Sequence, residues 1–442
     1  MPVTKELQVQ TPAMSMMSFA VHRREPELVG PAAPTPRETK RLSDLDDHET
    51  LRVQVPFVFF YRAGGLDAAS VIRRALGEAL VPYYPLAGRV REVEERKLVV
   101  DCTGEGVLLV EAYADVRLVE IEDAGGCLRA PFPSMDQLLF DVEGSGGVLH
   151  CPLLLVQVTR LLCGGFVFAL RLNHTMCDAT GIAQFLLAVG ELARGLPAPT
   201  IAPAWCRELL EARNPPKPLF PHREFEAVPP PPPPADLVTR TFTFTAADVA
   251  SIRKSLPPRP RDTATAFEVL TAFLWRARTA ALELPEGEIA RLVIIANLRG
   301  VAELNLPAGY YGNACVAPTA LATAEALQRG SLGDAMELVR EAKAAVTAEY
   351  ARSSADMLVL RGRPLLTLAN LFVVSDHRHT GFHRLDLGWG EPVYGGGADV
   401  VFGLAFLVAV NNGGGDGAVA AIVALPRPAM RRFASEMERL SK

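Results

Sequence analysis

The sequence predicts an α/β protein with two domains, each built around a mixed β-sheet. The chain has 442 residues, more than one ordinary hydrophobic core accommodates. Hydrophobic residues make up 49% and charged residues 21% of it, as in well-packed globular proteins. Strand and helix patterns are mixed in both halves without strict βαβ alternation, which favours α/β layers. We expect an N-terminal domain over 1–213, a linker over 214–235 and a C-terminal domain over 236–442.

The first half carries both strand and helix periodicities. Strands are indicated by runs rich in Val and Phe, or by strict alternation, in which every second residue from Phe166 to His174 shares one face. Helices are indicated by apolar residues at helical spacing, and Pro82 ends the first helix. We expect strands at 52–61, 98–101, 106–112, 153–162 and 166–173, and helices at 68–81 and 181–196.

The linker is the clearest break in the chain. It contains six consecutive prolines at 229–234, which fit neither a helix interior nor a central strand, so an extended connection is expected. The second half again mixes both periodicities and closes with a short helix. We expect strands at 238–244 and 292–296, helices at 246–256, 263–284 and 332–350, and a hairpin of 400–410 and 418–425 across a Gly-rich turn at 411–417.

Composition and charge exclude several classes of protein. A net charge of −5 argues against a nucleic-acid or anionic-membrane partner. No uncharged apolar run approaches the roughly 18 residues of a membrane helix, and Lys5 and Glu6 interrupt any signal peptide. Seven scattered cysteines without a C-x-x-C pair indicate a reducing compartment and no cysteine zinc site. We expect a cytoplasmic monomer, or a peroxisomal protein if the natural C-terminus continues past Ser441-Lys442 to Ser-Lys-Leu.

The stretch R-L-N-H-T-M-C-D-A-T-G places His174 at the end of an apolar strand. One interpretation is a core histidine whose ring bonds to a backbone carbonyl. The other is a general base for an alcohol, because a water-poor pocket keeps an imidazole neutral until it accepts a proton. Asp178 is awkwardly placed to be its catalytic partner, so we interpret it as a helix N-cap or an ion-pair partner. Cys177 has apolar neighbours and no evident cation to stabilise a thiolate nucleophile.

Two further clusters lie in the second half. Asp376, His377, His379 and His383 have spacings that a transition metal could use, but the segment also has the polar character of a solvated loop. We expect no metal site there. Trp389 stands between two glycines and is either a structural plug or a ligand contact, in which the indole N–H donates a hydrogen bond.

These residues resemble the plant BAHD acyl-CoA-dependent acyltransferases along nearly the whole chain. His174 to Asp178 resembles the family's H-x-x-x-D motif. Asp386 to Gly390 resembles its D-F-G-W-G motif, with Leu387 in place of Phe. Further similar stretches are Y-P-L-A-G-R at 84–89, N-L-R at 297–299 and Y-G-N at 311–313.

The resemblance implies two chloramphenicol-acetyltransferase-like domains with a channel between them. His174 would lie in that channel, reached by acyl-CoA from one side and by a small alcohol from the other. It would deprotonate the alcohol, whose oxygen attacks the thioester directly. By the same resemblance, Trp389 would stabilise the oxyanion, Asp178 would pair with Arg299, and Asp386 would be structural.

The resemblance also implies contacts to the co-substrate, acyl-CoA, and a substrate class. Arg253 and Lys254 would meet the CoA phosphates, Thr265 its pantetheine, and Gly388 would allow a close approach to the ligand. The stretches at 306–313, 357–364 and 390–396 resemble the alcohol acyltransferases of the family. Transfer of benzoyl to benzyl alcohol is therefore expected. The alternatives are an aliphatic or hydroxycinnamoyl-CoA alcohol acyltransferase, or a family member that binds a ligand without catalysis.

Overall fold

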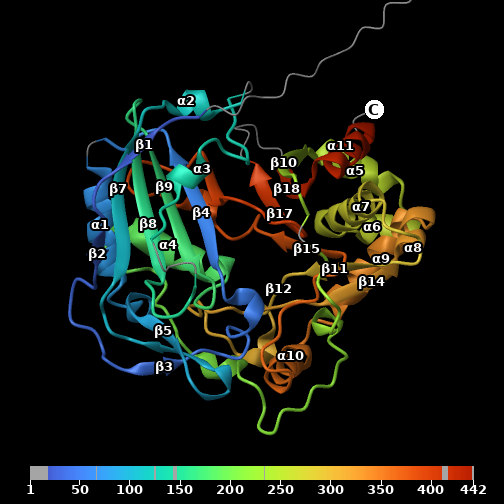
Figure 1. The fold of residues 1–442 in the computed structure, drawn as a ribbon, viewed down its shortest axis with the longest axis horizontal. Coiled ribbons are helices and arrows are strands. Elements are labelled where there is room, and N and C mark those ends of the chain that lie inside the picture. The colour runs from blue at the N-terminus through green and yellow to red at the C-terminus, as the bar shows by residue number, and fades with distance from the viewer. Residues whose placement is uncertain are drawn as a thin grey trace, which may run out of the picture.

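The two halves of the chain form two α/β layers that lie side by side (Figure 1). The computed structural model describes residues 18–65, 67–123, 126–142, 147–232, 234–410 and 417–440. The predictions for Lys5 and Glu6, for most of the Gly-rich turn and for Ser441-Lys442 lie outside these ranges. Parallel and antiparallel pairs occur in both large sheets, so the expected α/β class with mixed sheets is confirmed.

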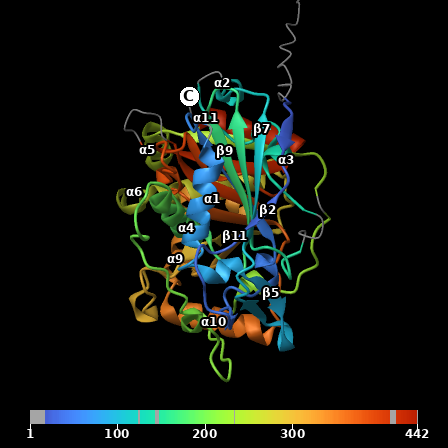
Figure 2. The same cartoon turned by 90° about the vertical axis from the view of Figure 1, so that its left-hand side faces the viewer.

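The first sheet has the strand order β1-β7-β8-β9-β4-β16, with β2 also paired to β7. Helices α1 (Ala68–Ala79) and α4 (Ala179–Ala193) pack on one face of it, in front of the strands in Figure 2. The strands are β1 (Val21–Arg23), β2 (Glu27–Val29), β4 (Gln54–Tyr61), β7 (Val107–Ala114), β8 (Leu154–Leu161), β9 (Phe166–Asn173) and β16 (Tyr394–Gly397).

Strand β9 shows why this sheet reads as strongly apolar. Phe168 and Leu170 enter the core under α1 and α4, whereas the alternate residues Val167 and Ala169 enter a second core. That second core also contains Phe406 and other residues of the C-terminal sheet. Successive side chains of a strand point to opposite faces of the sheet, and here each face is covered by a core. Residues of both kinds in β9 are therefore buried and apolar.

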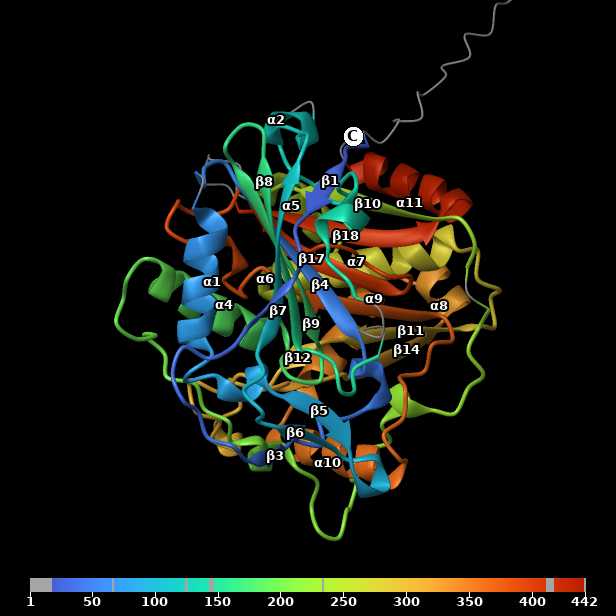
Figure 3. The ribbon, with the colours of Figure 1, turned by 60° about the vertical axis from the view of Figure 1, so that its left-hand side comes forward.

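The second sheet has the order β10-β18-β17-β15-β11-β14. Its strands are β10 (Leu237–Phe244), β11 (Ile289–Ile294), β14 (Thr319–Thr323), β15 (Leu371–Asp376), β17 (Leu404–Val410) and β18 (Ala418–Pro426). Helices α7, α9 and α11 bury their apolar faces against it, and Figure 3 shows α11 along β10 and β18. The helices of this half are α5 (Ala246–Lys254), α6 (Pro258–Thr263), α7 (Ala266–Ala281), α8 (Ala324–Arg329), α9 (Leu332–Ala344), α10 (Ala348–Leu360) and α11 (Arg427–Leu440).

Two smaller sheets and two short helices complete the fold. They are β3 (Thr39–Arg41), β5 (Arg89–Glu92) and β6 (Leu98–Asp101) in one sheet, β12 (Ala296–Asn297) and β13 (Cys315–Val316) in the other, and the helices α2 (Leu118–Ile121) and α3 (Met135–Leu138). In the part of the chain that the structure describes, no helix combines the length and apolarity needed to cross a membrane.

Three expectations differ from the structure. The single helix expected over 332–350 is two helices, because the Thr347 hydroxyl accepts from the Tyr350 N–H and starts α10 anew. The closing helix is not short, since α11 has 14 residues. Strand β16 belongs to the second half of the sequence but pairs with β4 of the first sheet, so that sheet draws on both halves.

Candidate active site

His174 follows directly after β9, between the two halves of the molecule. Its backbone N–H donates to the Val53 carbonyl at 2.9 Å. Its ring Nδ1 lies 3.0 Å from the carbonyl oxygen of Cys177. A carbonyl only accepts hydrogen bonds, so Nδ1 carries the proton and Nε2 keeps a free lone pair. The backbone carbonyl expected for a core histidine is thus present. This hydrogen bond uses only Nδ1, so the other ring nitrogen, Nε2, is available as a base.

Asp178 does not contact His174 but holds the loop that carries it. Its carboxylate accepts from Arg299 at 2.7 and 3.0 Å, in a bidentate pair. It also accepts from the backbone N–H of Ala314 at 2.9 Å. Burial raises the pKa of Asp178, but the Arg299 charge and these hydrogen bonds outweigh it, so the pKa lies below the usual value. The carboxylate is ionised at neutral pH.

The same carboxylate begins α4. The Gly181 N–H donates to Asp178 at 2.8 Å, as expected for an N-cap. A side chain at Gly181 would place its Cβ 2.0 Å from the Tyr311 carbonyl oxygen. Glycine is therefore needed for the helix start to approach the segment that supplies Ala314. Asp178 ties one loop to the other half of the chain.

A second buried carboxylate, Asp46, anchors the same loop from the opposite side. One of its oxygens accepts from Arg207 at 2.6 Å and from the Asn313 backbone and side-chain nitrogens at 2.8 and 2.9 Å. Arg207 in turn donates to the Met176 carbonyl at 2.7 Å, and Asn313 donates to the His174 carbonyl at 2.9 Å. Two carbonyls of the histidine loop are thus fixed through one carboxylate.

Sequence reasoning missed the role of Asp46 and Arg207. Asp46 lies in the short acidic stretch 44–47, which has no helix or strand periodicity, and its partner Arg207 is far away in the chain. The sequence offers one hint of this role. Leu45 is apolar and is buried in the structure, so its charged neighbour Asp46 was a candidate for burial, and a buried charge needs a partner.

Cys177 is fully buried beside these residues. Burial raises its pKa above the ordinary thiol value, and the nearby Arg207 charge does not offset this effect. The side chain is a neutral thiol at physiological pH. The geometry gives no support to a thiolate nucleophile.

The structure does not bring Trp389 to His174. The indole packs edge-on against Phe166, with ring centroids 5.6 Å apart. Phe166 begins β9 and His174 follows its end, a separation of roughly 25 Å at the usual rise per residue. The predicted oxyanion role of Trp389 is therefore replaced by a packing role at the far end of the strand.

The turn around Trp389 is organised by Asp386, in line with a structural role. The Asp386 carboxylate accepts from the backbone N–H groups of Gly388 and Gly390 at 2.8 and 2.9 Å. Its backbone carbonyl accepts from Arg194 of the segment after α4. Gly388 has a positive φ of 107°, which favours glycine for reasons of backbone geometry alone. Its predicted proximity to CoA stays a prediction.

The other predicted CoA residues lie on α5 and α7. Arg253 and Lys254 occupy the last turn of α5. Thr265 is the N-cap of α7, where its hydroxyl accepts from the Glu268 N–H at 3.3 Å. This capping accounts for Thr265 without a ligand. The contacts of all three residues with CoA stay predictions.

The histidine-rich segment after β15 does not gather ligands. Asp376 pairs with Arg378 at 2.6 Å, and His377 Nε2 lies 3.0 Å from the Ser375 hydroxyl. Burial lowers the pKa of His377 to about 4. Across the described ranges, no group of three or more His, Cys, Asp or Glu side chains is arranged to hold a metal ion.

Comparison with known sequences gives one consistent result. The profile of the Transferase family matches residues 19–440. Benzyl alcohol O-benzoyltransferase of Petunia hybrida is 50% identical over 441 residues, covering 97% of this chain and 95% of that protein. Alcohol acyl transferase 1 (allele GSd) of Malus domestica is 47% identical, covering 96% and 94%.

Solved structures share the fold at lower sequence identity. The crystal structure of vinorine synthase matches with a TM-score of 0.73 and 22% identity, covering 95% of this chain and 98% of that one. That of F. graminearum TRI101 complexed with coenzyme A and deoxynivalenol matches with a TM-score of 0.71 and 15% identity, covering 90% and 97%.

Proposed function

Because this chain belongs to the Transferase family, the BAHD acyltransferases, we propose that it transfers an acyl group from acyl-CoA to the hydroxyl of a small alcohol. The family and the coarse activity follow from the profile match and from relatives at about half identity over nearly the full length. The mechanism and the substrates are our proposal. We also propose that the protein acts as a monomer.

The observation that carries the mechanism is the fixed tautomer of His174. With Nδ1 committed to the Cys177 carbonyl, Nε2 is the nitrogen that can accept a proton. The loop bearing it is held by Asp178 and Asp46, which limits the reorientation of the ring. A positioned imidazole whose Nε2 faces no competing partner is the group that general-base catalysis on an alcohol requires.

In the proposed reaction, His174 Nε2 accepts the proton of the alcohol as its oxygen forms a bond to the thioester carbonyl carbon. The tetrahedral intermediate then collapses, the carbon–sulfur bond breaks, and the CoA thiolate leaves. The imidazolium returns its proton to the thiolate, giving the ester, free CoA and neutral His174. No covalent acyl-enzyme forms, so both substrates must be bound together.

We propose benzoyl-CoA and benzyl alcohol as the substrate pair. Support comes from the Petunia hybrida relative and from a Nicotiana tabacum relative that carries the same name at 48% identity. A second candidate is transfer to aliphatic alcohols. It is supported by the alcohol acyltransferases at 45–47% identity and by a (Z)-3-hexen-1-ol acetyltransferase of Arabidopsis thaliana at 46%.

The test is a matrix of acyl-CoA donors against alcohols, run on the wild type and on His174→Ala. We expect benzyl benzoate as the best product of the wild type, and a kcat lower by about 10²- to 10⁴-fold in the variant. Replacement of the exposed His22 by Ala is the matched control and should leave kcat unchanged.

Two outcomes would contradict the proposal. Substantial turnover by His174→Ala would remove the general-base role. Parallel double-reciprocal lines with an acyl group trapped on Cys177 would replace the ternary complex by a covalent route. A wild type that turns over no donor with any alcohol would instead indicate a family member that binds a ligand without catalysis.

A further inference from the structure

The linker contains six consecutive prolines, and covalent geometry determines the conformation of such a run. Each proline ring fixes its own φ at about −65° and keeps the preceding residue out of the α region. A run of prolines is therefore a left-handed polyproline II helix, in which no hydrogen bond forms within the helix. Residues 229–232, which the structure describes, thus present a preformed helix of the kind that peptide-recognition domains bind.

Residues 229–232 lie on the outside of the molecule. In Figure 2 the yellow-green linker descends along the right-hand edge. All four prolines are exposed. A proline has no backbone N–H, and within the described part of the chain no backbone donor bonds to the carbonyl oxygens of these four residues. The rings and the carbonyl groups of this stretch are therefore available to a partner.

The chain on each side of the run is fixed to the folded body. Before the run, the Thr367 N–H donates to the Glu224 carbonyl at 2.8 Å, and the Thr367 hydroxyl donates to the Glu226 carbonyl at 2.7 Å. After the run, the Asp236 carboxylate accepts from Arg427 at 2.8 and 2.9 Å. Because both ends are held, a partner that binds the run has little chain entropy to overcome.

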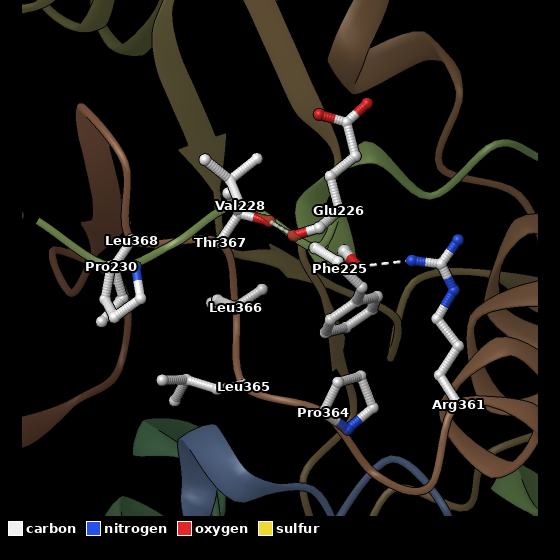
Figure 4. A pocket seen from close by; sticks show the side chains of 11 residues that line it. Phe225, Glu226, Val228, Pro230, Arg361, Pro364, Leu365, Leu366, Thr367 and Leu368 are labelled. Atoms are coloured by element: carbon white, nitrogen blue, oxygen red, sulfur yellow. Dashed lines mark hydrogen bonds between the residues drawn. The ribbon is translucent and has the colours of Figure 1, made fainter.

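An apolar hollow of about 720 Å³ adjoins the run (Figure 4). In Figure 4 side chains of the linker and of the segment after α10 face each other across it. Leu365 and Leu368 on its wall are 44% and 38% exposed, so apolar surface reaches the solvent beside the prolines. The apolar residues that line the hollow include Phe225, Val228, Pro230, Leu365, Leu366 and Leu368.

The hollow takes up only one edge of the proline helix. A polyproline II helix has three residues per turn, so Pro229 and Pro232 share one edge, while Pro230 and Pro231 lie on the other two. Pro230 is the one of these four that lines the hollow. The other two edges face away from it, and they are the surface that an aromatic-lined groove contacts in polyproline recognition.

The charges near the run distinguish among partners of this class. Residues 224–236 contain the acids Glu224, Glu226 and Asp236 and contain no Lys or Arg. A domain whose groove ends in an acidic pocket for a basic residue would find no such residue here, and its charge would be repelled. The chemistry of the run therefore suits a partner that recognises the proline rings and carbonyl groups themselves.

We propose that residues 229–232 and the apolar hollow beside them form a docking surface for a protein domain that binds a polyproline II helix in a groove of aromatic side chains. Aromatic rings of the partner pack on Pro229, Pro231 and Pro232, and its hydrogen-bond donors reach the free carbonyl groups. An apolar side chain of the partner enters the hollow. This interaction goes beyond the proposed transferase activity and uses none of the residues assigned to it.

The test titrates the full-length protein with purified profilin, which binds bare runs of proline through aromatic side chains, in an isothermal calorimeter. We expect saturable binding that a decaproline peptide competes away. A variant with Pro229→Ser, Pro231→Ser and Pro232→Ser should bind at least about tenfold more weakly. The matched control carries Pro34→Ser and Pro36→Ser, two exposed prolines outside any run, and should bind as the wild type does.

Circular dichroism checks that both variants are folded, and their ester formation should equal that of the wild type. The proposal is overturned if the wild type does not bind profilin at about 1 mM, or if the triple variant binds it equally well. It is also overturned if the wild type ignores profilin but binds phosphatidylcholine vesicles or forms a dimer on size-exclusion chromatography through this surface. Each of these results is independent of the transferase assay.

Discussion

At the scale of single residues, Asp178 shows how one buried carboxylate can fix a loop through several hydrogen bonds. It is 5% exposed and bonds to Arg299, to the start of α4 and to Ala314. Removing one partner of a buried ion pair leaves the other charge without compensation. Such changes are strongly destabilising even where the intact pair contributes little.

We expect Asp178→Asn to lower the free energy of unfolding at pH 7 by about 3–5 kcal/mol, because the Arg299 guanidinium, whose side chain is only 18% exposed, loses its counter-charge. Denaturant unfolding of the wild type and the variant measures the difference. Asp248→Asn, a partly exposed carboxylate in the capping box of α5, is the control and should cost no more than about 1 kcal/mol. Equal losses in the two variants would contradict the argument.

The same pair predicts a pH dependence. The pKa of Asp178 is lower in the folded state than in the unfolded chain, where it is about 3.9. Its contribution to stability is therefore fully present above that unfolded value and is lost as the pH falls through the folded pKa. The difference in melting temperature between the wild type and Asp178→Asn should be constant from about pH 7 to pH 5 and narrow below about pH 4. A difference that widens on acidification would contradict this sign.

At the scale of elements, the turn at 42–47 and the loop after β9 act as one unit through Asp46. We expect Asp46→Ala to lower kcat by about tenfold or more with a smaller effect on KM, because Arg207 and Asn313 lose the acceptor that orients them toward the loop carbonyls. Steady-state kinetics separates the two constants. Asp101→Asn in β6, which breaks a surface ion pair with Arg91, should change neither.

A fall in kcat alone would also follow from partial unfolding, so Asp46→Ala is compared with the wild type by circular dichroism at the assay temperature. Asp46→Glu is the second variant in this comparison. Its longer carboxylate restores the charge opposite Arg207 and should recover part of kcat. An equal rise in KM for both substrates, with kcat intact, would show that Asp46 shapes binding rather than the position of His174.

The parts of the site that depend on a pattern of neighbouring residues could be predicted from the sequence. The alternation along 166–174 and the N-cap at Asp178 are properties of adjacent residues, and both are present in the structure. The position of Trp389 was not predictable from the sequence. The pattern D-L-G-W-G identifies a turn, but it does not tell which end of β9 that turn packs against. Arg207 and Asn313 meet Asp46 only through long-range topology, which periodicity does not encode.

At the scale of the whole molecule, the two sheets are joined by more than the linker. Strand β16, from the second half of the sequence, pairs with β4 over residues 394–397. Arg363 donates to Asp44 and to the Asp47 carbonyl across the same junction, at 3.0 and 3.1 Å. We therefore keep the boundaries 1–213, 214–235 and 236–442 as a proposal for chain organisation, and do not expect the halves to fold independently.

This junction predicts that the linker is dispensable as a covalent tether. We expect a chain cut at a protease site inserted between Pro234 and Ala235 to remain one particle on size-exclusion chromatography, and to retain transferase activity. The shared core of Phe60, Val167, Phe406 and neighbouring residues stays buried only while the halves remain together. Residues 1–213 made alone would expose that surface and lack β16, so they should be insoluble. Separation of the cut fragments in plain buffer, or a soluble, cooperatively unfolding 1–213 fragment, would show that each half holds its own fold.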